Sequence, residues 1–425
     1  MERLNYFNRY DSKDAHHEDQ LTRAYLVLLK HSVHAFFTFF EYCRDKLKLE
    51  DGELSPSFLE YIDNDWTIDT QKSNPNIGTY YLWSVLITDE KISNDSSISP
   101  SDRNARYDGI ITFGHRLTMI IENKPESNNV WPDQLNPSKQ NLSGDVIIYK
   151  NPTILEWKEI IKHLNSLLSV STISGYEKIM INDFLSFVDE KFTHLNPYDN
   201  FSLCKNNESL LYRRIENILK SIVFDPMTIK RHRGWGYYID VPFEQIKQIG
   251  LILNKNQEDW KLELSLCFGD SQQQAKGFYS STINISKLKE LNDWNSSANF
   301  HVSFSSSNLV WFESNIDKYK YIEYWIKNIG LIYQRKKNEV EPYLETLEKD
   351  DIIIYNFDKQ KEMDDKYFST NMQTLNICPG FAMTFNISSK DAMEKDKTKE
   401  LEKLISEKIK EGLSIANLEW KEILK

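Results

Sequence analysis

The sequence predicts an α/β protein, with a mixed central sheet flanked by helices and a second region of α+β type after it. Three observations support this fold class. Two short apolar runs, residues 107–113 and 118–123, are separated by a glycine-containing turn. A helical pattern of apolar residues precedes them, and strand-like runs with turns between them follow Asp225-Pro226. Apolar residues spaced as on one face of a helix indicate helix, and short apolar runs bounded by turn residues indicate strand.

Length and composition bound the class of protein. A chain of 425 residues is long enough for two domains, which we expect at 1–225 and 226–425. Its hydrophobic fraction of 40% is that of a globular protein. The polar start Met1-Glu2-Arg3 argues against a secretory signal, and we find no apolar run near the length of a membrane span. Four cysteines without a Cys-x-x-Cys pair indicate reduced thiols. We therefore expect a cytoplasmic protein that does not enter a membrane.

The elements follow from local patterns in chain order. Residues 15–48 predict one long helix, on which His31 and His34 are interpreted as surface or packing residues. Residues 79–88 predict an apolar strand or a short buried helix. Further helices are expected at 152–168, 175–191, 208–223, 316–336 and from about 389 onward. Further strands are expected at 145–150, 236–241, 260–268, 277–285, 300–304, 310–312, 351–355 and 382–385.

The hairpin at 107–124 brings charged residues into an apolar setting. Side chains alternate between the faces of a strand, so Glu122 and Lys124 point the same way. If the two strands pair antiparallel around Gly114, the start of the first strand lies beside the end of the second. Asp108 then lies next to Glu122 and Lys124. We therefore expect two carboxylates and a lysine at one end of a sheet.

This combination suits metal-assisted cleavage of a phosphodiester bond. Mg²⁺ prefers oxygen ligands and commonly takes one or two carboxylates together with substrate phosphate. Such a metal polarises a phosphoryl oxygen and lowers the pKa of a bound water. The lysine would orient that water or stabilise charge at phosphorus. The alternative is an ordinary hairpin with surface charges, because acid-x-Lys triplets recur at Asp89, Glu156, Asp364 and Glu419. The triplet at Glu122 differs from these because it ends an apolar strand that follows another apolar strand beginning with Asp.

The order of Asp108, Glu122 and Lys124 resembles the PD-(D/E)xK nuclease superfamily, which has the restriction-endonuclease-like fold. Tyr107 stands where the family often has Pro. The resemblance covers roughly the first 170 residues. It implies that Asp108 and Glu122 bind metal and that Lys124 is the catalytic lysine.

Two more residues match positions of that family. Glu18 lies at the start of the first helix, where many members carry a glutamate that reaches the metal, although it could instead complement the helix dipole. Gln134 follows the Lys124 strand, where some members place a glutamine that positions the metal-bound water or phosphate. The alternative for Gln134 is an exposed residue at a helix start.

The resemblance implies a Mg²⁺-dependent endonuclease acting on DNA, with Mn²⁺ as a substitute metal. Such domains occur in restriction, repair and phage-defence systems. The second domain, which lacks a catalytic motif, would serve substrate selection, self-association or control, so a homo-oligomer or a defence-system partner protein is expected. The alternative function is a non-catalytic module that retains the fold and binds nucleic acid or protein.

The net charge of the chain bears on whether it binds nucleic acid. The net charge of −11 counts against a simple nucleic-acid binder and predicts weak, salt-sensitive DNA binding unless a local basic region assists. One basic and aromatic segment is a candidate for phosphate contact and base stacking. Its residues are Lys230, Arg231, Arg233 and Trp235, and Arg213-Arg214 would extend it. The alternative is a basic loop that leads into an aromatic strand.

Overall fold

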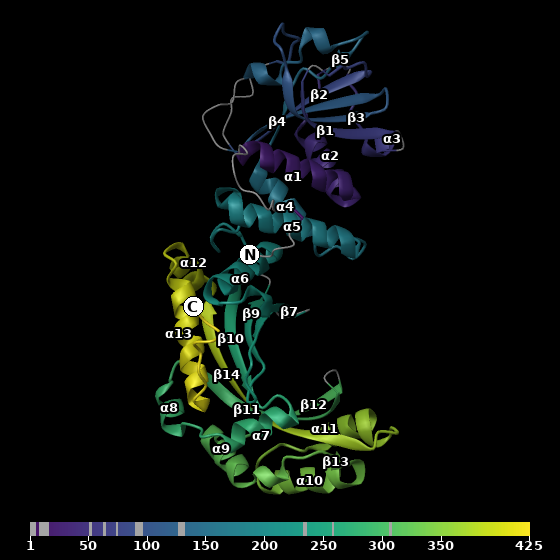
Figure 1. Ribbon diagram of the computed structural model, residues 1–425. Coiled ribbons are helices and arrows are strands. Elements are labelled where there is room, and N and C mark those ends of the chain that lie inside the picture. The colour runs from purple at the N-terminus through teal and green to yellow at the C-terminus, as the bar shows by residue number, and fades with distance from the viewer. Residues whose placement is uncertain are drawn as a thin grey trace. The chain divides into compact units, whose positions relative to one another are not determined.

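The computed structural model describes residues 6–7, 17–50, 53–62, 65–73, 75–89, 97–125, 132–232, 236–256, 259–305 and 308–425, with the side chains of residues 17, 18, 132 and 133 excluded. The chain is a mixed α/β protein of two compact units, Met1–Asp199 and Asn200–Lys425 (Figure 1). Each unit contains its own sheet. The division lies before the helix at 208–222, which the sequence-based boundary at 225 assigned to the first domain.

The first unit is built on a mixed sheet. Its strands are β1 (Trp66–Ser73), β2 (Tyr81–Thr88), β3 (Arg106–Phe113), β4 (Leu117–Lys124), β5 (Ile147–Ile148) and β6 (Thr153–Leu155). They lie in the order β1-β3-β4-β2-β5, and β6 also pairs with β2. β3 is antiparallel to both β1 and β4, whereas β2 is parallel to β4. The central strands β2 and β4 are buried along nearly their whole length, which explains why their sequences are continuous apolar runs.

Helices cover one face of this sheet. They include α1 (His17–His31), α2 (Val33–Lys46) and α4 (Trp157–Leu167). α5 (Gly175–Lys191) packs against α1 and α4, and the short α3 (Phe58–Ile62) packs against α2. Figure 1 shows α1 and α2 beneath the strands. Tyr25 of α1 contacts both Trp157 of α4 and Phe184 of α5, so these helices share one apolar layer. The single helix expected at 15–48 is wrong, because Ser32 accepts a hydrogen bond from the backbone of Ala35 and thereby starts a second helix.

The opposite face of the sheet is covered by an irregular segment. It includes the 3₁₀ helices η1 (Pro132–Leu135) and η2 (Lys139–Asn141). Apolar side chains of the sheet and of this segment form two clusters, which include Leu82 with Leu142 and Leu86 with Leu135. The helix that the Gln134 assignment assumed is therefore a single 3₁₀ turn, and the strand expected at 145–150 is reduced to Ile147–Ile148.

The second unit is built on an antiparallel sheet with eight strands in the described residues. They are β7 (Ile229–His232), β8 (Gly236–Asp240), β9 (Gln248–Lys255), β10 (Trp260–Phe268), β11 (Asn295–Ser305), β12 (Asn308–Phe312), β13 (Arg335–Lys336) and β14 (Thr374–Ser388). The order is β12-β11-β14-β10-β9-β8-β7, with β13 paired to β14. The burial pattern of β10 alternates along its length, so this strand buries only one of its faces.

Helices pack on that buried face. The second unit contains α6 (Glu208–Ile222), α7 (Gln272–Ser280), α8 (Ile285–Glu290), α9 (Lys318–Lys327), α10 (Lys337–Lys349), α11 (Phe357–Met363), α12 (Ser389–Lys397) and α13 (Glu400–Leu413). Phe278 of α7 stacks on Phe268, and Gly412 of α13 lies against Leu266. The strand expected at 277–285 is wrong, because Ser271 caps α7 through a hydrogen bond from Gln274. The helix expected at 316–336 ends at Lys327, and residues 351–355 are not a strand.

Two findings concern the cysteines and the described helices of both units. The four cysteines form no disulfide, and Cys43, Cys204 and Cys378 are buried. None of the described helices combines the length and the apolar character that a membrane crossing requires.

Candidate active site

The β3–β4 hairpin brings Asp108 to the end of β4. Backbone pairing runs from Phe113 and Leu117 at the turn to Gly109 and Ile121. The backbone pairing of the two strands ends there, and Asp108 is the next residue of β3 toward its start. There Oδ2 of Asp108 accepts a hydrogen bond of 2.9 Å from the backbone N–H of Asn123. The Asp108 carboxylate is therefore bonded to the residue that follows Glu122. The hairpin itself holds the two carboxylates near each other.

Glu122 and Lys124 form a nearly buried ion pair. Their Oε1 and Nζ atoms lie 3.4 Å apart, and their side chains are 8% and 13% exposed. Burial raises the pKa of Glu122 to about 7, and the negative charge of Asp108 adds to this effect, while Lys124 and Arg103 act in the opposite direction. The site therefore holds negative charge that its lysine only partly offsets. The structure brings together the three residues Asp108, Glu122 and Lys124.

Asn123, between the two charged residues, holds the strand end in place. Its side chain is buried and lies on the helix-covered face of the sheet, opposite to Glu122. Nδ2 donates to Oγ1 of Thr22 in α1 at 2.7 Å, and Oδ1 accepts from Nε1 of Trp157 in α4 at 2.8 Å. Two helices thereby fix the strand that presents Glu122 and Lys124. Sequence reasoning missed this role because Asn123 is the variable position of the Glu-x-Lys triplet.

The side chain of Glu18 lies outside the described residues, but its helix is placed. Leu26 of α1 lies over Gly109, which pairs with Ile121, and Thr22, one turn earlier, bonds Asn123. Moving one turn toward the N-terminus of α1, about 5.4 Å, thus corresponds to moving two residues toward the end of β4, about 6.6 Å. A further turn toward the N-terminus brings the backbone of Glu18 to the level of the end of β4. The helix packs on the face of the sheet opposite to Glu122.

Gln134 lies on the same side of the sheet as Glu122. The neighbouring Leu135 packs against Leu86, and Leu86 pairs with Glu122 across β2 and β4. Oε1 of Gln134 is buried and has no hydrogen-bond partner among the described residues. An orphaned amide oxygen in this position is available to a ligand or a water.

Arg103, which sequence reasoning missed, ties η1 to the start of β3. Its guanidinium donates to the backbone oxygens of Gln134 and of Asn136, the latter at 3.1 Å. Its charge also lowers the pKa of Glu122. No sequence pattern predicts a role for Arg103, because it lies in a loop and its contacts are to backbone oxygens more than thirty positions away.

The oxygen donors of the site have the chemistry that Mg²⁺ prefers. Asp108 and Glu122 supply carboxylates, and Gln134 supplies an amide oxygen that lacks a partner within the described residues. Mg²⁺ sites commonly use one or two carboxylates and keep several waters. In the part of the chain that the structure describes, no group of three or more His, Cys, Asp or Glu side chains is arranged to hold a metal. Two carboxylates and an amide oxygen are nevertheless donor types that Mg²⁺ accepts.

The basic segment of the second unit is only partly described. Lys230 and Arg231 are exposed on β7, whereas Arg233 and Trp235 lie outside the described residues. The guanidinium of Arg231 lies 5.3 Å from the ring centre of Tyr212. The expectation that Arg213 and Arg214 extend this segment is wrong. Both are buried, and they pair with Glu216 at 3.3 Å and with Asp396 at 2.6 Å, respectively.

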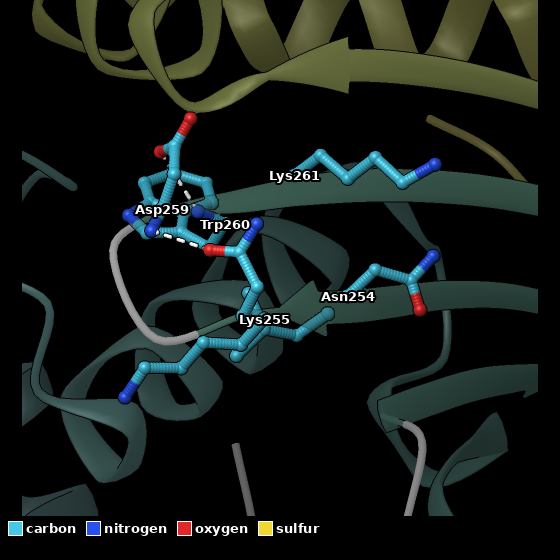
Figure 2. Close-up of a pocket in the computed structure, with 7 residues that line it drawn as sticks. Asn254, Lys255, Asp259, Trp260 and Lys261 are labelled. Atoms are coloured by element: carbon cyan, nitrogen blue, oxygen red, sulfur yellow. Dashed lines mark hydrogen bonds between the residues drawn. The ribbon is translucent and has the colours of Figure 1, made fainter.

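A hollow of about 520 Å³ lies at the β9–β10 end of the second unit. It is lined by Leu253, Asn254, Lys255, Asn256, Asp259, Trp260 and Lys261. Figure 2 shows that the two lysines extend in different directions, and Lys255 donates to the backbone oxygen of Asn206 at 3.1 Å. The hollow therefore does not direct its cations toward one bound anion.

Comparisons of this chain with protein-family models, with curated proteins and with solved structures found no match.

Proposed function

We propose that this protein is a metal-dependent nuclease of restriction-endonuclease-like fold that hydrolyses phosphodiester bonds of DNA. One observation carries the proposal. Two carboxylates, Asp108 and Glu122, meet at the end of a hairpin beside a lysine whose Nζ lies 3.4 Å from Glu122. The restriction to DNA and a role in restriction or phage defence follow from the sequence resemblance.

In this proposal Asp108 and Glu122 bind Mg²⁺ or Mn²⁺, and Gln134 contributes through its amide oxygen. The bound metal would polarise a phosphoryl oxygen and make water a better nucleophile. The oxygen of water adds to phosphorus, one P–O ester bond breaks, and a phosphate monoester and a hydroxyl group remain. Lys124 donates a hydrogen bond to the attacking water or to a phosphoryl oxygen that gains negative charge. Asn123 keeps Lys124 in position through its bonds to Thr22 and Trp157.

The direct test is cleavage by the full chain. Plasmid and single-stranded DNA are incubated with the protein in Mg²⁺, in Mn²⁺ and in EDTA. We expect cleavage that requires metal and that falls by about 10²–10⁴-fold in Lys124→Ala, since removal of a group that stabilises developing charge or transfers a proton has effects of this size. Folding of the variant is checked by its circular dichroism spectrum.

The matched control is Lys366→Ala. Lys366 also belongs to an acid-x-Lys triplet, but it lies in the second unit and pairs with Glu362 at 2.9 Å. This variant should cleave as the wild type does. Undiminished cleavage by a folded Lys124→Ala protein would contradict the assignment.

The alternative is a non-catalytic module that retains the fold and binds nucleic acid or protein. It is favoured by the Glu122–Lys124 contact, because such a pair also occurs as a purely structural feature. Calorimetry with Mn²⁺ separates the two functions. The nuclease requires a Mn²⁺ site that is lost in Asp108→Ala, whereas the alternative predicts no such difference between the two proteins.

A further inference from the structure

Arg103 is held beside the candidate active site by neutral groups. Nε donates to the backbone oxygen of Asn136 at 3.1 Å, and Nη2 donates to that of Gln134. The guanidinium carbon lies 5.8 Å from the ring centre of Tyr107, the residue that precedes Asp108. The side chain is therefore oriented by two carbonyl oxygens and one aromatic ring.

Within the described residues, Arg103 forms no ion pair with a carboxylate, since no carboxylate oxygen there lies within 4.0 Å of its guanidinium. Other cations of the protein differ in this respect. Lys139 pairs with Asp102 at 3.2 Å, and Arg214 pairs with Asp396 at 2.6 Å. A guanidinium has five N–H donors, of which the two carbonyl bonds use two, so donors remain for an anion.

The contacts of Arg103 indicate on which side of the sheet it lies and that it is close to Glu122. Its bond to Gln134 anchors it to η1, which lies on the Glu122 side of the sheet. It is close enough to Glu122 for its charge to lower the pKa of that carboxyl. Lys124, the ion-pair partner of Glu122, lies at the end of β4. Two cations therefore accompany two carboxylates at this end of the hairpin.

We propose that Arg103 binds a non-bridging oxygen of a DNA phosphate at, or directly next to, the bond to be cleaved. This inference rests on the proposed nuclease function and adds a substrate-binding residue to it. A phosphate diester approaching Asp108 and Glu122 meets two negative groups on a chain of net charge −11, so binding requires local positive charge. Arginine suits this task because its planar donors match the oxygens of a phosphate. The neutral anchors keep the guanidinium oriented without reducing its charge.

The test measures DNA binding separately from cleavage. A fluorescent duplex oligonucleotide is titrated with the full chain in EDTA, over a series of salt concentrations, and bound DNA is followed by anisotropy. We expect Arg103→Ala to weaken binding at least tenfold at low salt. We also expect the slope of log affinity against log salt to fall by about one, the value for one lost phosphate contact. Arg103→Lys should retain part of the affinity. In cleavage assays with Mg²⁺, Arg103→Ala should raise KM more than it lowers kcat.

Lys139→Ala is the matched control. It removes the same charge from the neighbouring η2, but this lysine is already paired with Asp102. Its affinity should stay within twofold of the wild type. Binding by Arg103→Ala within twofold of the wild type would overturn the inference. So would weaker binding with an unchanged salt slope, since this indicates that Arg103 only supports η1.

The outcomes separate this inference from the proposed function. A wild type that binds DNA but does not cleave it contradicts the nuclease, whereas a lower salt slope in Arg103→Ala still supports the phosphate contact. A wild type that cleaves, together with an Arg103→Ala variant that binds equally well, keeps the nuclease and overturns the role of Arg103. A wild type that neither binds nor cleaves overturns both.

Discussion

At the scale of single residues, Glu122 is a charged group in a nearly buried position. It faces the negative Asp108, and its lysine partner lies at 3.4 Å. Burial of a carboxylate costs free energy unless its charge is compensated. The compensation that Lys124 gives is incomplete, as the pKa of about 7 for Glu122 indicates. Such unrelieved charge is typical of functional sites.

This gives a prediction for stability against pH. Because the pKa of Glu122 is raised from 4.5 to about 7 by burial and by Asp108, the folded state binds more protons than the unfolded state between these values. The contribution of Glu122 is present below pH 4.5 and is lost as the pH rises through 7. In EDTA, Glu122→Gln should therefore raise the free energy of unfolding by about 1–3 kcal/mol at pH 8 and change it little at pH 4.5.

Scanning calorimetry at the two pH values checks this expectation. Glu159→Gln serves as control, because Glu159 is 39% exposed and pairs with Lys162 on the surface of α4. It should change stability little at either pH. Equal effects of Glu122→Gln at pH 4.5 and pH 8 would show that the carboxylate is not destabilising in its charged form. Cleavage should be lost in Glu122→Gln at both values.

The sequence predicted part of this site, for a physical reason. Asp108, Glu122 and Lys124 lie within one hairpin, so alternation along the strands and antiparallel pairing were enough to bring them together. Arg103 and Asn123 depend on partners far along the chain, which a local pattern does not reveal. The same reason explains the error at Arg214, whose partner Asp396 is 182 positions away. From the sequence alone, a buried arginine cannot be distinguished from an exposed arginine until its ion-pair partner is known.

At the scale of elements, a hydrogen bond between Thr22 of α1 and Asn123 of β4 supports the site. Thr22→Val keeps the shape of the side chain but leaves Nδ2 of Asn123 without this acceptor. A buried donor that loses its partner costs about 1–3 kcal/mol. We expect a lower unfolding temperature of the first unit and slower DNA cleavage, because the end of β4 is less firmly held.

Thr38→Val is the control for this change. The hydroxyl of Thr38 donates to the backbone oxygen of His34 at 2.8 Å within α2, an oxygen that the helix also bonds. Removal of the Thr38 hydroxyl should lower the unfolding temperature of the first unit less than removal of the Thr22 hydroxyl does, and it should leave DNA cleavage unchanged. Equal losses of stability and of cleavage in the two variants would show that the Thr22–Asn123 hydrogen bond does not specifically support the site.

Elements were predicted best where the apolar pattern was long and regular. The strands β3 and β4 and the helix α5 follow directly from such patterns, whereas the pattern at 79–88 left a strand and a short buried helix open, and the structure has the strand β2 there. Errors arose at caps. Ser32 and Ser271 each start a helix through a side-chain hydrogen bond, and neither start was recognised from the sequence. A serine in a loop and a serine at a helix start have the same identity, so only the backbone geometry distinguishes them.

At the scale of the whole molecule, the chain forms two units that each enclose a sheet. In the second unit, Asp396 of α12 is almost completely buried and accepts hydrogen bonds from Arg214 of α6 and from the backbone of Phe201, the latter at 2.8 Å. These contacts join the start of the second unit to its C-terminal helices. They explain why α6 belongs to this unit, although the sequence-based boundary placed it in the first domain.

We therefore predict that calorimetry of the full chain resolves two unfolding transitions. Asp396→Ala leaves the buried charge of Arg214 without its main partner, which costs about 3–5 kcal/mol. It should lower only one transition temperature, whereas Thr22→Val should lower the other. Asp391→Ala, on the exposed start of the same helix, should have a smaller effect of about 1 kcal/mol or less, because its contacts there are solvent-exposed. If Asp396→Ala and Thr22→Val shifted one common transition, the two units would unfold as a single cooperative body. Two independent transitions would instead mean that each sheet is stabilised by its own core, and that metal added to the wild type should raise only the transition that Thr22→Val lowers.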